Sequence, residues 1–250
     1  MPIFTADLCV GDILFKKASS SAISKAIAKG QMGHYKATVK KVGTVEGITA
    51  EQAVKITHVA MAAGPDDVLE FDEGGASKSE IVLRRGHGFV RGPMSLASRK
   101  GKQYEVYRCL HPELAKAAAD KAALIWDLSH QVGGKISASY GLANMLKTAL
   151  FHRKGEAASS AAYFEKALDA WVRSSTGGFF SSPVDLQFFC SEFVAFCYMW
   201  AAAETGIGRM FGAGYLLGTE KYRMSPVEMY MRVVTTGKGS FTLRGPLYNG

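Results

Sequence analysis

The first half of the chain carries short apolar runs separated by turn signals, a pattern typical of β-strands. A turn at Val10-Gly11-Asp12 leads into the first run. The turn sequence Gly64-Pro65-Asp66-Asp67 separates two later runs and predicts a hairpin. The expected strands cover residues 10–15, 56–62, 68–72, 81–83 and 104–108. Ahead of the hairpin, Ile23 and Ile27 indicate a short amphipathic helix over 19–29, and the polar, glycine-punctuated residues 30–55 indicate an excursion over the surface.

The second half of the chain has a helical pattern instead. Apolar residues recur at helical spacing from Pro112 to Gln131, and Gly133-Gly134 ends that segment. Further helices are expected over 142–153, 157–173 and 190–204, and one begins at Ser225-Pro226. Strands first and helices second predict an α+β fold. We see no repeat and no separating linker, so residues 1–250 are expected to form a single domain.

Composition and charge restrict the class of protein. The chain is 48% hydrophobic and 21% charged, which excludes disordered and collagen-like classes. Its net charge of +8 makes acidic partners plausible, among them an anionic cell-wall polymer, a membrane surface or nucleic acid. The densest basic cluster, at 84–91, carries no nucleic-acid motif. We therefore expect a solvated basic surface and no nucleic-acid partner.

The cysteines and the N-terminus indicate a cytoplasmic site of synthesis. Cys9, Cys109, Cys190 and Cys197 form no C-x-x-C pair and have no metal-site spacing, so free thiols are expected. No dinucleotide loop or P-loop is evident, and no cofactor or metal is expected. The N-terminus lacks a signal-peptide pattern, and the apolar stretch 193–203 is too short for a transmembrane segment. Export would require a route without a cleaved leader.

The candidate chemistry involves a cysteine and a histidine that are far apart in the sequence. Cys190 opens an apolar helix, where the positive end of the macrodipole favours a thiolate. His58 lies inside an apolar strand and can complete a nucleophile pair with it. A hairpin turn centred on Gly64-Pro65 places His58 opposite Glu70, whose carboxylate would orient the imidazole. Asp72 shares that face and replaces Glu70 if the register slips by two residues.

Around the thiol, Phe188, Phe189 and Phe193 are expected to line a dry pocket, and the backbone N–H of Cys190 could stabilise an oxyanion. A non-catalytic interpretation stays open. A buried cysteine is most often a small hydrophobe, and a lone histidine in an apolar strand is usually structural.

These motifs together resemble those of the circularly permuted NlpC-type cysteine peptidases and amidases, which are papain-like enzymes whose histidine strand precedes the cysteine helix. The resemblance lies in four segments in the same order: Gly11-Asp12-Ile13-Leu14-Phe15, Thr57-His58-Val59-Ala60-Met61, Val68-Leu69-Glu70 and Phe189-Cys190-Ser191-Glu192-Phe193-Val194. They cover about a tenth of the chain but span most of its length. The resemblance implies a small antiparallel sheet packed against a central helix that carries the cysteine.

Carried over by position, the resemblance implies Cys190 as nucleophile, His58 as general base and acid, and Glu70 as the residue that orients His58. Tyr140, Phe189 and Ser191 are then candidate pocket residues. Residues 30–55 and 142–182 would be family-specific insertions.

The resemblance also implies cleavage of amide bonds, most often in peptidoglycan peptides. A subset of such proteins resembles antibacterial toxins delivered by type VI secretion, which need no cleaved leader and are countered by immunity proteins. Such a protein would act in a target cell or the periplasm as a monomer, although oligomeric state stays open. The alternatives are an acyltransferase, deamidase or thioesterase that uses the same dyad, and a non-catalytic binding module.

Overall fold

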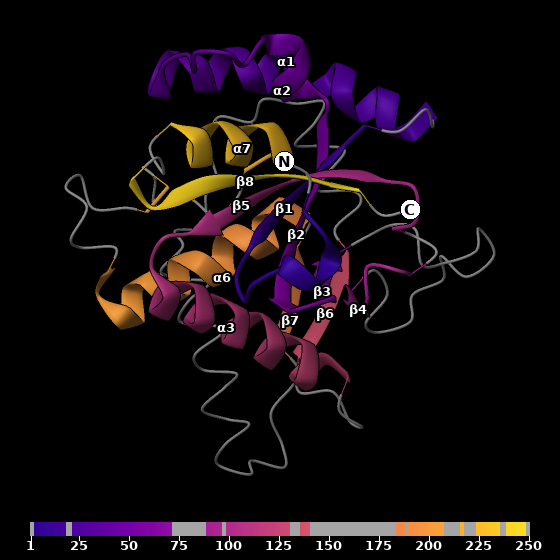
Figure 1. Cartoon of the computed structure of the whole chain (residues 1–250), viewed down its shortest axis with the longest axis vertical. Coiled ribbons are helices and arrows are strands. Elements are labelled where there is room, and N and C mark those ends of the chain that lie inside the picture. The colour runs from indigo at the N-terminus through magenta and orange to yellow at the C-terminus, as the bar shows by residue number, and fades with distance from the viewer. Residues whose placement is uncertain are drawn as a thin grey trace.

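The computed structural model describes residues 3–18, 22–71, 89–96, 99–130, 136–140, 184–188, 190–207, 216–217, 224–235 and 239–248. Its centre is a six-stranded antiparallel sheet with the strand order β4-β3-β2-β1-β5-β8 (Figure 1). The strands are β1 (Ile13–Lys17), β2 (Ile56–Gly64), β3 (Asp67–Phe71), β4 (Phe89–Gly92), β5 (Gln103–Cys109) and β8 (Phe241–Tyr248). A separate parallel pair joins β6 (Ile136–Tyr140) to β7 (Val184–Phe188).

The described helices pack on the face of the sheet that carries Val59, Met61 and Leu69. The helix α6 (Cys190–Thr205) packs on α3 (Pro112–His130) and against β2 and β3. The helix α7 (Pro226–Val234) contacts both β2 and α1 (Ala22–Val42), and the short α2 (Ala50–Val54) lies beside α1. A 3-10 turn, η1 (Thr5–Asp7), precedes β1.

The two faces of the sheet have separate apolar clusters. Val59, Met61 and Leu69 belong to the larger cluster, which also contains buried residues of α3, α6 and α7. Ala60, Ala62 and Val68 belong to a smaller cluster on the other face. This division follows from the two-residue period of a strand, and it determines which face each polar residue of β2 and β3 shares.

Most elements expected from the periodicity are confirmed within the described residues. The strands at β1, β2, β3 and β5, the hairpin, and the helices α3 and α6 all occur where the pattern indicates. Ser225 caps α7, accepting a hydrogen bond from the Glu228 backbone N–H. The structure is therefore α+β. The expected strand at 81–83 and helices at 142–153 and 157–173 lie outside the described residues, and the pattern missed β4, β6, β7 and β8.

The expectation of a polar excursion at 30–55 is wrong. The helix α1 runs on to Val42, well beyond the predicted end at 29, and α2 follows it. The inner face of α1 is polar but buried, at Gln31, His34 and Thr38. The Gln31 side-chain amide donates to the carbonyls of Val54 and Ile56 and accepts from an α7 backbone N–H, so hydrogen bonds hold α1 against the sheet.

The predicted hairpin register is also wrong, by two residues. Met61 pairs with Leu69 and Ala62 with Val68, because the turn is displaced toward Pro65-Asp66. Continued along the strands, this register does not place Glu70 opposite His58. Among the described residues, no helix has the length and apolar character needed to cross a membrane.

Candidate functional site

His58 lies at the start of β2, directly after a β-bulge. Lys16 of β1 pairs with His58, whereas the next residue, Lys17, pairs with Ile56, so Thr57 is an extra residue in β2. A bulge interrupts the alternation of side chains and redirects the residue beside it. As a result, Ile56 joins the larger core, while His58 shares the other face with Ala60. Its side chain is buried.

Glu70 approaches His58 from the neighbouring strand β3. It lies on the same face as Val68, and therefore on the same face as His58. Nε2 of His58 is 2.7 Å from Oε2 of Glu70. The two residues are diagonal neighbours, a separation that long side chains can bridge. Because a carboxylate can only accept, Nε2 carries the proton and Nδ1 is the ring nitrogen left for another partner.

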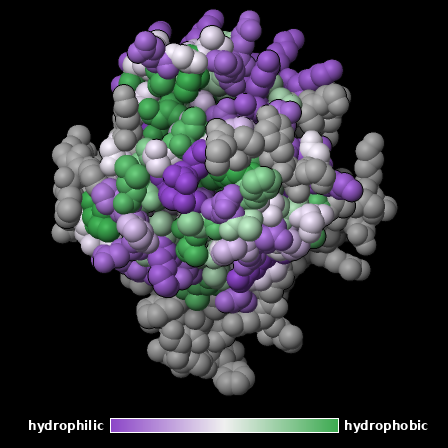
Figure 2. Space-filling model, in the orientation of Figure 1, coloured by the Kyte–Doolittle hydropathy of each residue, from purple (hydrophilic) through white to green (hydrophobic). Residues whose placement is uncertain are grey.

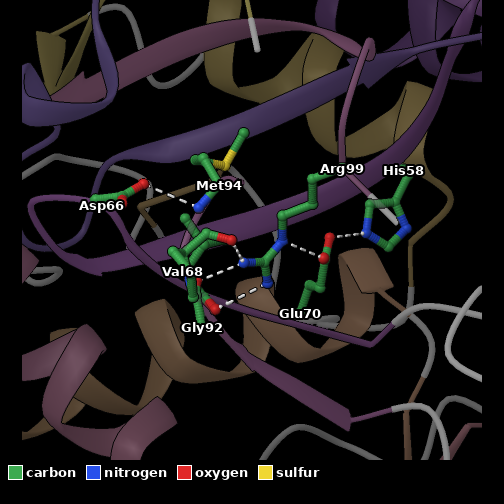
Figure 3. A network of polar contacts seen from close by, with 8 residues as sticks. His58, Asp66, Val68, Glu70, Gly92, Met94 and Arg99 are labelled. Atoms are coloured by element: carbon green, nitrogen blue, oxygen red, sulfur yellow. Dashed lines mark hydrogen bonds and ion pairs between the residues drawn. The ribbon is translucent and has the colours of Figure 1, made fainter. Parts of the chain in front are cut away.

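Arg99 holds the other oxygen of the same carboxylate (Figure 3). Its Nε lies 2.6 Å from Oε1 of Glu70, and both side chains are only 1% exposed. The rest of the guanidinium donates to three backbone carbonyls, at 3.0 Å to Val68, at 2.8 Å to Pro93, and to Gly92. The sequence analysis did not identify Arg99. It lies outside the regular strands, and no motif includes it.

Cys190 is the first residue of α6 and is almost completely buried. The hydroxyl of the next residue, Ser191, donates to the Met224 carbonyl at 2.6 Å and fixes the first turn of the helix. Phe193, one turn along, packs against Phe71 of β3, so the start of α6 is anchored on the sheet. The N-terminal N–H groups of a helix provide a positive field for a thiolate.

Cys190 and Glu70 together decide the protonation of His58. Burial lowers the pKa of His58, and the positive charge of Lys16 lowers it further. The charge of Cys190, a side-chain hydrogen bond with Cys190 and the hydrogen bond to Glu70 outweigh both effects and raise this pKa to about 9. The imidazole is therefore held as a cation between Glu70 and Cys190.

Glu70 stays ionised although it is buried. Burial raises the pKa of its carboxyl, but the hydrogen bond and charge of His58, with the charges of Arg99 and Lys16, lower it to about 2. A buried charge needs such compensation, because desolvation otherwise disfavours the ionised form. The described side chains that act on this carboxylate come from β1, β2 and the segment after β4.

The structure brings together three of the residues predicted for the site: Cys190, His58 and Glu70. The other predictions fare differently. Ser191 is buried and uses its hydroxyl on a backbone carbonyl, and Phe193 lies in the core. Tyr140 pairs with Phe188 in the β6–β7 ladder, and nothing more is described of their side chains. Asp72 and Phe189 lie outside the described residues.

The other three cysteines do not lie at the start of a helix. All four cysteines are free, as expected. Burial raises the pKa of Cys109 to about 11 and also raises the pKa of Cys197, while Cys9 is exposed. In the part of the chain that the structure describes, no group of three or more His, Cys, Asp or Glu side chains could hold a metal ion.

Comparisons with known proteins give no match: no family model, no curated protein and no solved structure is similar to this chain.

Proposed function

We propose that the chain is a cysteine hydrolase that cleaves amide bonds with Cys190, His58 and Glu70. One observation carries this proposal: Glu70 binds Nε2 of His58, while Cys190 at the start of α6 interacts with the same imidazole. A buried thiol of purely structural use has no need of an oriented histidine. A structural histidine equally has no need of both an ionised glutamate and a thiol.

The proposed reaction has two steps. The Cys190 thiolate attacks the amide carbonyl, and the His58 imidazolium gives its proton to the leaving amine, which departs as the carbon–sulfur bond of an acyl-enzyme is completed. Neutral His58 then removes a proton from water, and the resulting hydroxide attacks the thioester. The carbon–sulfur bond breaks, which releases a carboxylic acid and restores the Cys190 thiolate beside the His58 imidazolium. The backbone N–H of Cys190 is the candidate oxyanion donor. Glu70 stays ionised throughout and keeps the imidazole oriented.

The proposed fold family is the circularly permuted NlpC-type, papain-like one. In support, the histidine strand β2 precedes the cysteine helix α6 in the chain, and α6 packs against the strands that carry His58 and Glu70. The single-domain interpretation of residues 1–250 belongs to the same proposal.

The proposed substrate is a peptidoglycan peptide, and the proposed role is that of an antibacterial effector that an immunity protein would counter. The net charge of +8 supports action on an anionic cell wall. Delivery by a specialised secretion route would place the activity in a target cell or its periplasm. An acyltransferase, deamidase or thioesterase would use the same three residues, and the product of the reaction distinguishes these activities.

The first test is the rate at which iodoacetamide alkylates each cysteine, read by peptide mass spectrometry at pH 6 and pH 9. We expect Cys190 to react quickly at pH 6, where an ordinary thiol of pKa about 8.5 is protonated. His58→Ala should remove this reactivity. His111→Ala is the matched control, because His111 lies away from His58. Both His58 and Tyr104 pair with Lys16 of β1, and His111 follows Tyr104 by seven residues, beyond the end of β5.

Slow alkylation of Cys190 that does not depend on His58 would contradict the dyad and favour the binding module. If the dyad is active, wild type and Cys190→Ala are compared on peptidoglycan and on its muropeptide fragments. New amine termini that appear only with wild type support the amidase. Labelled acyl transfer to an added amine, or ammonia release without chain cleavage, would replace the amidase with a transferase or a deamidase.

A further inference from the structure

We propose that Arg99 is a positioning residue, which holds Glu70 ionised and in place so that His58 keeps its proton on Nε2 and presents Nδ1 to Cys190. This inference rests on the proposed function for its catalytic meaning. Its structural content, the state of Glu70 and the tautomer of His58, can be measured independently of any reaction.

The geometry of the guanidinium carries this inference. Arg99 is fully buried, and its contacts join Glu70 to carbonyls of β3 and of the segment after β4 (Figure 3). The planar fork of five N–H groups can bind a carboxylate and several carbonyls at once, whereas an ammonium group has three N–H groups on a flexible stem. The carboxylate is thus fixed from the side opposite His58, by a cation that does not titrate.

Charge balance explains what Arg99 contributes. The groups that face Glu70 and His58 are Arg99, Lys16 of β1 and Cys190 of α6. The guanidinium of Arg99 balances the carboxylate of Glu70, and Lys16 adds a further positive charge that lowers the pKa of both His58 and Glu70. Without the guanidinium, the buried carboxylate would compete with the thiolate for the imidazole proton, because desolvation favours its protonated form. A protonated Glu70 could donate to the ring and would no longer require the proton on Nε2.

The test compares Arg99→Gln, which removes the charge, with Arg99→Lys, which keeps the charge but not the fork. The matched control is Arg108→Gln, because Arg108 also binds a buried carboxylate, that of Asp12, at 2.8 and 2.9 Å through two nitrogens. The readouts are the pH profile of Cys190 alkylation and the NMR titration of the Glu70 carboxyl carbon. A third readout is the ¹⁵N shifts of His58 above its pKa of about 9, where the ring is neutral and the shifts report its tautomer.

We expect the acid limb of the alkylation profile to move up by about one pH unit in Arg99→Gln, a tenfold loss of rate on that limb. The Glu70 carboxyl should titrate at a correspondingly higher pH. Arg99→Lys should restore part of the shift, and Arg108→Gln should leave both profiles at their wild-type positions. Profiles that superimpose on wild type in both Arg99 variants would overturn the proposal and leave Arg99 a structural role.

The NMR readouts separate this proposal from the proposed function. If Cys190 proves unreactive in wild type, the hydrolase fails, but the Glu70 titration and the tautomer still decide the role of Arg99, and both can be read in Cys190→Ala. If Arg99→Gln does not fold, Arg99→Lys and the wild-type tautomer carry the test. Above pH 9, where the imidazole is neutral, a wild-type ring with its proton on Nδ1 alone would contradict the inference.

A second, independent inference concerns the outer face of α1. The exposed lysines Lys25, Lys29, Lys36 and Lys40 fall within an arc of about 60° at 3.6 residues per turn and extend over about 22 Å. The helix contains no Asp or Glu, and no ion pair joins these lysines to a carboxylate of the described residues. Hydrophilic side chains project along this edge of the molecule, over α1 (Figure 2).

We propose that this lysine ridge binds the surface of an anionic lipid bilayer. The four lysines lie along one side of a single helix, so a flat surface can meet them together. Two positions flank the arc between Lys29 and Lys36: Gly33 is exposed but has no side chain, and Met32 packs against the core. Binding would therefore be electrostatic. Each lysine near such a surface contributes about a fivefold gain in partitioning at physiological ionic strength.

The test is co-sedimentation with vesicles of phosphatidylglycerol and phosphatidylcholine in equal parts, against vesicles of phosphatidylcholine alone. We expect binding to the anionic vesicles only, weakened by added salt and reduced at least a hundredfold when Lys29, Lys36 and Lys40 are changed to Glu. The matched control changes three other exposed lysines, Lys55, Lys100 and Lys116, to Glu. It should reduce vesicle binding much less. Equal losses in the two triple variants, or binding to soluble polyphosphate without binding to vesicles, would overturn the proposal.

Discussion

Replacing Glu70 with Gln tests the electrostatics of the site without reference to any substrate. Glutamine has nearly the same shape, but it removes the charge and replaces one of the two accepting oxygens with an NH2 donor. It leaves the Arg99 guanidinium, 1% exposed, without its ion-pair partner. Breaking a buried ion pair by removing one partner costs about 3 to 5 kcal/mol.

The pKa of Glu70 gives a second estimate of the same quantity. The folded protein holds this pKa at about 2, against an ordinary value of 4.5, because the hydrogen bond and charge of His58 and the charge of Arg99 overcome the effect of burial. A folded pKa below the unfolded one means that the stabilisation is complete above pH 4.5 and is lost as the pH falls toward 2. The difference corresponds to about 3 kcal/mol at pH 7 and about 1 kcal/mol at pH 3.

The assay is urea unfolding of wild type and Glu70→Gln at pH 7 and at pH 3, with thermal unfolding as a second measure. At pH 7 we expect a loss of about 3 to 5 kcal/mol, which for a chain of this size lowers Tm by on the order of 10 °C. At pH 3 the difference should shrink by about 2 kcal/mol, because wild type has then lost much of the same stabilisation.

Asp67→Asn is the matched control. Asp67 forms an ion pair with Arg91, but both side chains are about one-third exposed. Removing an exposed carboxylate of this kind should cost less than about 1 kcal/mol. The reasoning would be refuted if Glu70→Gln cost no more than the control at pH 7, or if its cost were the same at both pH values, since Glu70 would then be neutral or unpaired in the folded protein.

Three further predictions concern stability. Because the pKa of His58 is raised to about 9 from 6.5, the free energy of unfolding should fall by about 3 kcal/mol between pH 6.5 and pH 9; Cys190→Ala should reduce that fall in the same urea titration. Gly11→Ala should cost at least about 2 kcal/mol in thermal unfolding, because φ is +80° and the new Cβ would lie 2.6 Å from the Ala115 carbonyl oxygen. Gln31→Leu should cost about 3 kcal/mol or more in urea, because it leaves three buried backbone groups without the side-chain partners they have in wild type; a loss below about 1 kcal/mol would show that water replaces the amide.

Elements whose inner face is apolar could be predicted from the sequence, and elements that depend on polar burial or distant pairing could not. The helix α6 is apolar on most sides and was found with nearly its observed bounds. The helix α1 was cut short because its inward-facing positions are Gln31, His34 and Thr38, which give no apolar period. The strand β8 contains Gly245-Pro246, a pair that argues against a strand, but β8 is at the edge of the sheet, where proline is tolerated.

Glu70 contacts His58, but by a geometry that differs from the predicted one. Direct opposition across the hairpin selected Glu70, yet the observed register is displaced by two residues. Glu70 reaches His58 as a diagonal neighbour on the same face, after the bulge at Thr57 has set the orientation of His58. The identity of the face depends only on the two-residue period and was predictable. The exact partner depends on side-chain length and on the bulge, neither of which the alternation of residues encodes.

No residue pattern predicts Arg99, because the need for it comes from the burial of the Glu70 carboxylate. A fully buried carboxylate that stays ionised beside a titrating imidazole needs a permanent cation. Arg91 of β4 lies on the strand next to Glu70 but does not supply this cation. In the observed register Arg91 pairs with Leu69, so it faces the opposite side of the sheet, where it binds Asp67. The same alternation that puts Glu70 beside His58 thus excludes the nearest arginine of β4, and the charge comes from Arg99, which reaches the carboxylate from the segment that follows this strand.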